Sequence, residues 1–200
     1  MPLLVLSQKS CNSIKIKRDE INQMKKTKVS IGLSNPKSPG NVGSVMRAAG
    51  NFRVDSVFYT GIRYPLALER NSVTENLRRK VSHDIPLSGV SSLLEAAPDN
   101  TEIICVEYAL NATPLPEFQH PDNAFYIFGP EDGTLDQAMI DQADAVVYVP
   151  TTGCMNLAAT VNVVLYDRLT KSYAGTGSNS IENNQRIRQN RDTNNNVKVR

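Results

Sequence analysis

Short apolar segments alternate with longer amphipathic ones along the middle of the chain, and this alternation limits the fold more than any other feature. Five apolar segments of four or five residues are typical of buried strands: 29–33, 56–60, 103–106, 124–128 and 145–149. Short strands that alternate with helices form a mainly parallel sheet covered by helices. We therefore expect one α/β domain over residues 29–172.

Helical spacing of apolar residues predicts the helices of this domain. We expect them at residues 41–52, from Ser88 onward, at 135–143 and from 156 to about 172. In the last helix, one stripe is expected to be buried: Leu157, Val161, Val164, Leu165 and Leu169. Residues 65–80 are charged and show no clear pattern.

Charge is distributed unevenly, although the formal net charge is only +2. Residues 1–28 hold seven Lys and Arg against two Asp and Glu, and residues 171–200 hold six against two. Residues 29–170 are acidic, with nine against sixteen. Basic ends suit contact with a polyanion, although tails that only increase solubility have the same pattern. We interpret residues 1–28 as a basic extension and the Asn-rich residues 173–200 as a disordered tail.

Composition also excludes several classes of protein. Cys11, Cys105 and Cys154 are too few and too widely spaced for a disulfide framework or a zinc site, so we expect no metal. The apolar start, residues 1–7, is too short for a secretion signal, and no apolar run approaches the ~20 residues of a membrane span. We expect a soluble, cytoplasmic protein that does not contact membranes. Motifs for dinucleotides, nucleoside triphosphates, zinc proteases and serine hydrolases are absent.

Three loops are the expected place of a ligand site, because ligands of parallel sheets bind at the carboxyl ends of strands. Loop 35–41 leads into a helix with Arg47, a cation that needs an anion or solvent on an otherwise apolar helix. Loop 129–134 carries Glu131, which is placed to pair with Arg47 or to bind a ligand. Loop 150–156 leads into a helix N-terminus, where free N–H groups bind anions or capping side chains. Each loop alone is also typical of an ordinary turn or cap.

Taken together and in order, the three loops resemble the motifs of the SpoU/TrmH family of SPOUT RNA 2′-O-ribose methyltransferases. The first motif holds residues at intervals of six: Asn35, Asn41 and Arg47. The second is the turn Phe128-Gly129-Pro130-Glu131, and the third is Val149-Pro150 with Cys154-Met155-Asn156-Leu157, ending at Tyr166-Asp167. The match covers residues 29 to about 171. The minimal members of the family, which modify the tRNA wobble position, are the most similar.

This resemblance implies a SPOUT fold with a C-terminal trefoil knot, and a homodimer with its sites at the subunit interface. It implies S-adenosylmethionine as cofactor and methyl transfer to a ribose 2′-hydroxyl of RNA, with tRNA favoured over rRNA. The residues that would hold the cofactor are Val106, Gly129, Val149, Cys154, Met155 and Leu157. The residues that would serve catalysis are Arg47, Asn35, Asn41, Glu131 and Asn156.

The resemblance also implies roles for these side chains. Arg47, from the partner subunit, would lie at the target ribose, where the family mechanism proposes it as a general base. Because a free guanidinium has a pKa above ~12, we favour a role in binding the flanking phosphate and lowering the pKa of the hydroxyl. Asn35 and Asn41 would orient Arg47, while Glu131 and Asn156 would brace the site.

One departure from the family pattern leaves alternatives open. Cys154 stands where the third motif has a serine, and a thiol is a weaker hydrogen-bond donor than a hydroxyl. One alternative is a knotted RNA-binding dimer without methylation activity. The other is a related methyltransferase that acts on a base of RNA.

Overall fold

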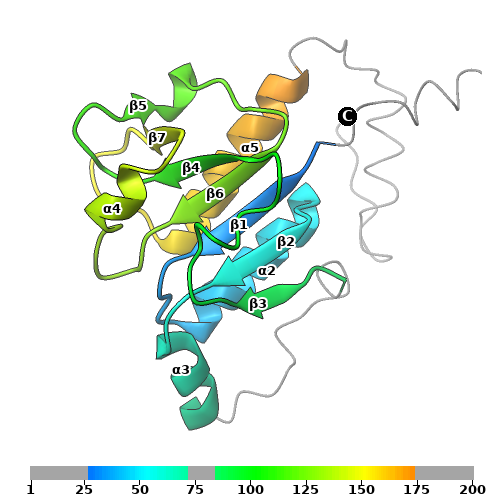
Figure 1. Ribbon diagram of the computed structural model, residues 1–200, viewed down its shortest axis with the longest axis vertical. Coiled ribbons are helices and arrows are strands. Elements are labelled where there is room, and N and C mark those ends of the chain that lie inside the picture. Colours follow the sequence, from blue (N-terminus) through cyan, green and yellow to red (C-terminus); the bar gives the residue numbers. More distant parts are fainter. Residues whose placement is uncertain (1–26, 72–83, 174–200) are drawn as a thin grey trace, which may run out of the picture.

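The structure is a computed structural model that describes residues 27–71 and 84–173. Within these residues, seven strands form one sheet in the order β3-β2-β1-β6-β4-β7-β5, and every pair of neighbours is parallel. The predicted α/β fold is confirmed (Figure 1). The Asn-rich tail and nearly all of the basic extension lie outside the described residues.

All five predicted strands are present, and two short ones are added. The strands are β1 (Val29–Leu33), β2 (Ser56–Tyr59), β3 (Leu87–Gly89), β4 (Glu102–Val106), β5 (Thr113–Pro114), β6 (Ala124–Phe128) and β7 (Ala145–Tyr148). The helices in the described part of the chain are α2 (Pro39–Phe52), α3 (Arg63–Asn71), α4 (Gln137–Ile140) and α5 (Leu157–Tyr173), together with the 3₁₀ turn η2 (Leu115–Glu117). The added strands, β3 and β5, are the two edges of the sheet.

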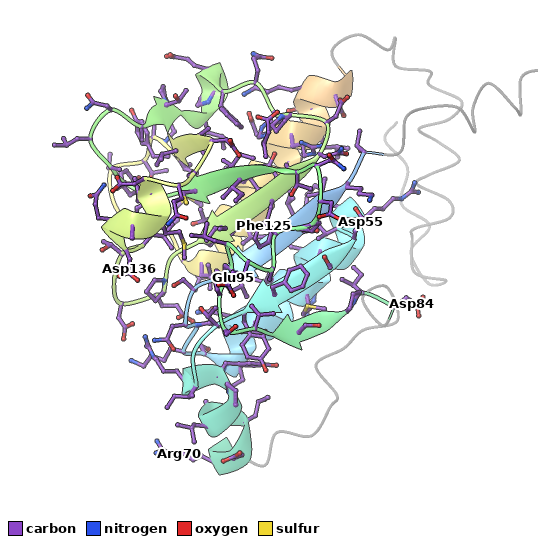
Figure 2. The ribbon with its side chains drawn as sticks, viewed as in Figure 1. Asp55, Arg70, Asp84, Glu95, Phe125 and Asp136 are labelled. Atoms are coloured by element: carbon purple, nitrogen blue, oxygen red, sulfur yellow. The ribbon has the colours of Figure 1, made fainter. Side chains whose placement is uncertain are left out.

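Strand β6 lies at the centre of the sheet, and each of its residues is buried. Successive side chains of a strand point to opposite faces, and β6 has a hydrophobic layer on each face. Tyr126 and Phe128 pack in the layer of α2 and α5, whereas Phe125 and Ile127 pack in the opposite layer. Phe125 is seen near the middle of the sheet in Figure 2. Burial of each such side chain contributes roughly 1.5–3 kcal/mol.

Helix α2 begins at Pro39, two residues before the predicted start. Ser38 is its N-cap, since the Ser38 Oγ accepts a hydrogen bond from the backbone N–H of Asn41 at 3.3 Å. Proline at the first helical position loses no intrahelical hydrogen bond, because that N–H has no partner within the helix. The helix ends at Phe52, and its C-cap Arg53 adopts the left-handed conformation with φ 56°.

The helix predicted from Ser88 is wrong. Residues 87–89 pair with β2 instead, with Leu87 opposite Val57. Only a turn follows, in which the N–H of Ala96 donates to the carbonyl of Ser92. The apolar spacing is explained by burial rather than by a helix, because Leu93 fills the hydrophobic layer beside Phe125.

Three further differences concern helices. Helix α3 begins at Arg63 and continues into the unpatterned segment, and the helix predicted at 135–143 is reduced to the four residues of α4. Leu169 is 36% exposed although it was expected in the buried stripe of α5, whereas the other four members of the stripe are buried. The trefoil knot stays a prediction.

Among the described residues, no helix combines the length and hydrophobicity that a membrane span requires. In the same part of the chain, no three His, Cys, Asp or Glu side chains gather closely enough to hold a metal ion.

Candidate active site

A pocket with an empty volume of about 690 Å³, including space open to solvent, lies at the carboxyl ends of β4, β6 and β7. All six residues that the sequence suggested for the cofactor line it: Val106, Gly129, Val149, Cys154, Met155 and Leu157. They come from three separate loops, which the sheet order brings together.

Glu131 also lines this pocket, and its carboxylate is held by the neighbouring loop. It accepts hydrogen bonds from the backbone N–H groups of Lys37 at 2.8 Å and Ser38 at 3.1 Å, and from the Asn41 side chain at 2.9 Å. Burial raises the pKa of Glu131, but the hydrogen bonds from Asn41 and the backbone outweigh this and lower it. Glu131 therefore does not pair with Arg47, as one expectation had it; it is a carboxylate that fixes the first loop.

Asn156 extends this network to the third loop. Its Nδ2 donates to the Oδ1 of Asn41 at 2.9 Å, and its own Oδ1 accepts from the N–H of Ala158 at 2.9 Å. Asn156 is thus the cap of α5, as an Asn immediately before a helix usually is. The Asn41 amide is therefore held at both ends, because its nitrogen donates to Glu131 and its oxygen accepts from Asn156.

Asn35 occupies a constrained position immediately after β1. It has a φ of 42°, and its backbone N–H donates to the Thr60 hydroxyl at 3.2 Å. Its buried side-chain oxygen has no hydrogen-bond partner among the described residues and lies against Gly61. Asn tolerates the left-handed conformation better than most residues, but an unpartnered buried polar atom is uncommon in folded proteins.

Arg47 lies on α2, and neither it nor Asn35 lines the pocket. The residue is exposed, and no described carboxylate pairs with it. Its neighbours Val45, Met46 and Ala48 are buried against the core. The helix therefore directs Arg47 to solvent, where its guanidinium is available to an anion.

Glu107 and Tyr108, which sequence reasoning missed, also line the pocket. Glu107 accepts from the N–H of Tyr108 at 2.8 Å and from that of Leu135 at 3.0 Å. The Tyr108 hydroxyl donates to the carbonyl of Val149 at 2.7 Å. Their position directly after β4 was the available signal, because the site loops follow the other strands in the same way.

Two cations lie on the surface beside the network of Glu131, Asn41 and Asn156. Asp132, next to Glu131, contacts the Arg63 Nη1 at 2.8 Å and the Lys37 Nζ at 3.4 Å. A hydrogen bond from Arg63 holds the pKa of Asp132 below its usual range. These contacts join the start of α3 to the loop after β6.

The chain is similar to known proteins along most of its length. The SpoU rRNA Methylase family matches residues 28–166. The tRNA (cytidine-2′-O-)-methyltransferase TrmJ of Methanocaldococcus jannaschii is 28% identical over 166 residues, which cover 72% of this chain and 68% of that protein.

Two solved structures share the fold. The SpoU methyltransferase AviRb of Streptomyces viridochromogenes, solved with AdoMet, has a TM-score of 0.58 at 20% identity and covers 76% of this chain. This chain spans only 60% of the length of AviRb. A structure described for 2-OH methylation of C/U34 on tRNA has a TM-score of 0.61 at 20% identity, covering 78% of this chain and 97% of that one.

The matched residues begin just before β1 and end within α5, so they include all three loops of the pocket. More than half of the chain is thus aligned with a single family, and the pocket lies where the strands of that segment end. The chain belongs to the SpoU rRNA Methylase family, a family of S-adenosylmethionine-dependent RNA methyltransferases.

Proposed function

We propose that this chain transfers a methyl group from S-adenosylmethionine to a ribose 2′-hydroxyl of RNA. The observation that carries the proposal is the pocket itself. The six residues suggested for the cofactor line one cavity, beside the hydrogen-bonded network of Glu131, Asn41 and Asn156.

The residues of the pocket fit this cofactor. Apolar side chains such as Val106, Val149 and Leu157 suit an adenine ring. The charged side chains on the pocket wall are the acids Glu107 and Glu131, which complement a positively charged ligand. When bound, S-adenosylmethionine supplies a methyl group that its positive sulfur makes electrophilic.

The protein then has to position the hydroxyl and help it to lose its proton. In the proposed reaction the ribose oxygen forms a bond to the methyl carbon, the carbon–sulfur bond breaks with its electron pair left on sulfur, and the hydroxyl proton passes to solvent. Arg47 binds the phosphate next to the target ribose and stabilises the negative charge that develops on the oxygen. Glu131, Asn41 and Asn156 hold the loops around this position.

Arg47 does not line the pocket of its own chain, which supports a homodimer in which the partner's Arg47 completes the site. We favour a tRNA over an rRNA substrate, because TrmJ and the C/U34 structure are both described for tRNA. An RNA substrate and the free thiols of Cys105 and Cys154 suit a cytoplasmic location.

Transfer of labelled methyl from S-adenosylmethionine to total RNA lacking this modification tests the proposal. After digestion to nucleosides, we expect the label in a 2′-O-methylnucleoside. Label in a methylated base would overturn the ribose assignment, and absence of label with cofactor binding intact would favour the RNA-binding alternative.

A matched pair of variants tests the role of Arg47. Arg47→Ala is expected to lower kcat/KM by about a hundredfold or more, the usual scale for loss of a group that stabilises transition-state charge. Arg70→Ala, on the exposed last turn of α3 (Figure 2), is the control and should leave activity within about twofold. Equal activities of the two variants would contradict the assignment.

A further inference from the structure

The pocket has a negatively charged wall, which bears on the ligands that it selects. Fifteen residues line it, and the only side chains among them with a formal charge are Glu107 and Glu131. Glu131 belongs to the network that joins the loops, and its oxygens accept from Lys37, Ser38 and Asn41. Glu107 has no part in that network, so its negative charge can be considered for its effect on the ligand.

The Glu107 carboxylate is fixed at the wall of the pocket. One oxygen accepts from the N–H of Tyr108 at 2.8 Å, and the other accepts from the N–H of Leu135 at 3.0 Å. A Cβ at Gly129 would lie 3.0 Å from the second oxygen, so the glycine permits the carboxylate to lie close against the loop after β6. No described Lys or Arg forms an ion pair with Glu107. Its negative charge is therefore directed to the pocket rather than neutralised by a neighbour.

The proposed reaction changes the charge of the ligand by one unit. S-adenosylmethionine carries a positive sulfur, an ammonium group and a carboxylate, for a net charge of about +1 at neutral pH. After methyl transfer the sulfur is a neutral thioether, and the net charge of S-adenosylhomocysteine is about zero. A pocket with fixed negative charge binds the first ligand more tightly than the second, and the difference increases as water is excluded.

On this basis we propose that Glu107 is a specificity-determining residue, which makes the pocket selective for cationic S-adenosylmethionine over its product, whose net charge is zero. The inference rests on the proposed function, because it takes this pocket as the cofactor site. Its consequence is that the product leaves readily and the enzyme resists inhibition by it.

Calorimetric titration of the full chain with three ligands tests the inference. These are S-adenosylmethionine, S-adenosylhomocysteine and sinefungin, in which an amine-bearing carbon keeps a positive charge at the position of the sulfur. The wild type is expected to bind both cationic ligands about tenfold more tightly than S-adenosylhomocysteine, which corresponds to about 1.4 kcal/mol. Similar affinities for all three ligands would overturn the inference without any variant.

Two substitutions separate the charge of Glu107 from its structural contacts. Glu107→Gln removes the charge and is expected to reduce the preference for cationic ligands to about threefold or less. Glu107→Asp keeps the charge but shortens the side chain, so it should lower all affinities together and leave their ratio close to that of the wild type. Glu117→Gln, an exposed residue of η2 outside the pocket, is the control for a general change of charge.

The outcomes distinguish this inference from the proposed function. An equal loss of affinity for all three ligands in Glu107→Gln would show that Glu107 is only structural. RNA methylation with no preference for the cationic ligands would overturn the selectivity and leave the proposed function standing. Absence of both methylation and binding of S-adenosylmethionine would overturn the proposed function and this inference with it.

Discussion

The side-chain nitrogen of Asn156 donates a hydrogen bond to the side-chain oxygen of Asn41, which lies 115 positions earlier in the chain, at 2.9 Å. The nitrogen of the same Asn41 amide donates to Glu131, also at 2.9 Å. Two hydrogen bonds thus connect the first turn of α2 with the loops that follow β6 and β7. Because an amide has one donor end and one acceptor end, no carboxylate can take the place of Asn41 between these two partners.

Replacement of Asn41 is the first prediction. Asn41→Asp places a second carboxylate beside Glu131 and should lower the free energy of unfolding by about 1–3 kcal/mol, because a hydrogen bond is replaced by repulsion between like charges. Denaturant unfolding measures the loss. Asn51→Asp, at an exposed position near the end of α2, is the control for the added charge. Equal effects at the two positions would contradict the role of the network.

Glu131 should make the stability of the protein depend on pH in the acid range. Hydrogen bonds lower its pKa in the folded state below the ordinary value of 4.5 despite burial. The stabilisation is therefore complete above about pH 4.5 and is lost as the pH falls toward the folded-state pKa. We expect the difference in unfolding free energy between wild type and Glu131→Gln to shrink over this interval. A difference that stays constant between pH 6 and pH 3 would be inconsistent with the lowered pKa.

His120 should produce a second, separate pH dependence. Its Nδ1 is 2.6 Å from the Tyr126 hydroxyl and its Nε2 is 2.9 Å from the Asp167 carboxylate. Burial lowers the pKa of His120 below 6.5 even though Asp167 acts in the opposite direction. The unfolded chain then binds the proton more readily, so stability is present above about pH 6.5 and falls below it.

Thermal unfolding of wild type and His120→Gln from pH 8 to pH 5 measures this effect. The stability of the wild type should fall by more than that of the variant as the pH decreases, so that the difference between the two shrinks. Subtraction of the variant curve removes the contributions that the two proteins share. Parallel curves over the whole range would exclude His120 as the source.

Alanine substitutions at Gly61 and Gly153 compare a crowded glycine with an open one in loops near the site. Gly61 has a φ of +76°, and an added Cβ would overlap the Asn35 side chain. We expect Gly61→Ala to lower the unfolding free energy by about 2 kcal/mol or more and to reduce methylation, since Asn35 must move. At Gly153 nothing lies within 4 Å of an added Cβ, so Gly153→Ala should change stability by only about 0.5 kcal/mol. Equal stability of the two variants would contradict the geometry.

Cys154 should be a tolerated replacement for the serine of the family motif. The residue is exposed on the wall of the pocket, and none of its contacts with the described residues is a hydrogen bond. Cys154→Ser is therefore expected to keep kcat/KM within about threefold, with the neighbouring Thr152→Ser as control. A many-fold increase in turnover would show instead that the thiol impairs the chemistry.

The sequence alone was sufficient for the fold class and for the loops that line the candidate pocket. Short, nearly continuous apolar runs identify β1, β6 and the other interior strands, because such strands are apolar on both faces. Turn residues and a helix cap such as Asn156 follow from local backbone chemistry, which neighbouring residues determine. These local signals also located the loops that line the pocket.

Only the tertiary structure decided which side chains meet. Glu131 binds Asn41 rather than Arg47 because β6 pairs with β1 and brings the two loops together, while α2 directs Arg47 to solvent. Likewise, residues 87–89 form a strand because β2 offers them an open edge. Such pairings depend on contacts across many tens of residues, and local propensity is too weak to specify them. The sequence by itself therefore determined the kind of fold and its loops, and tertiary packing decided the network within the site.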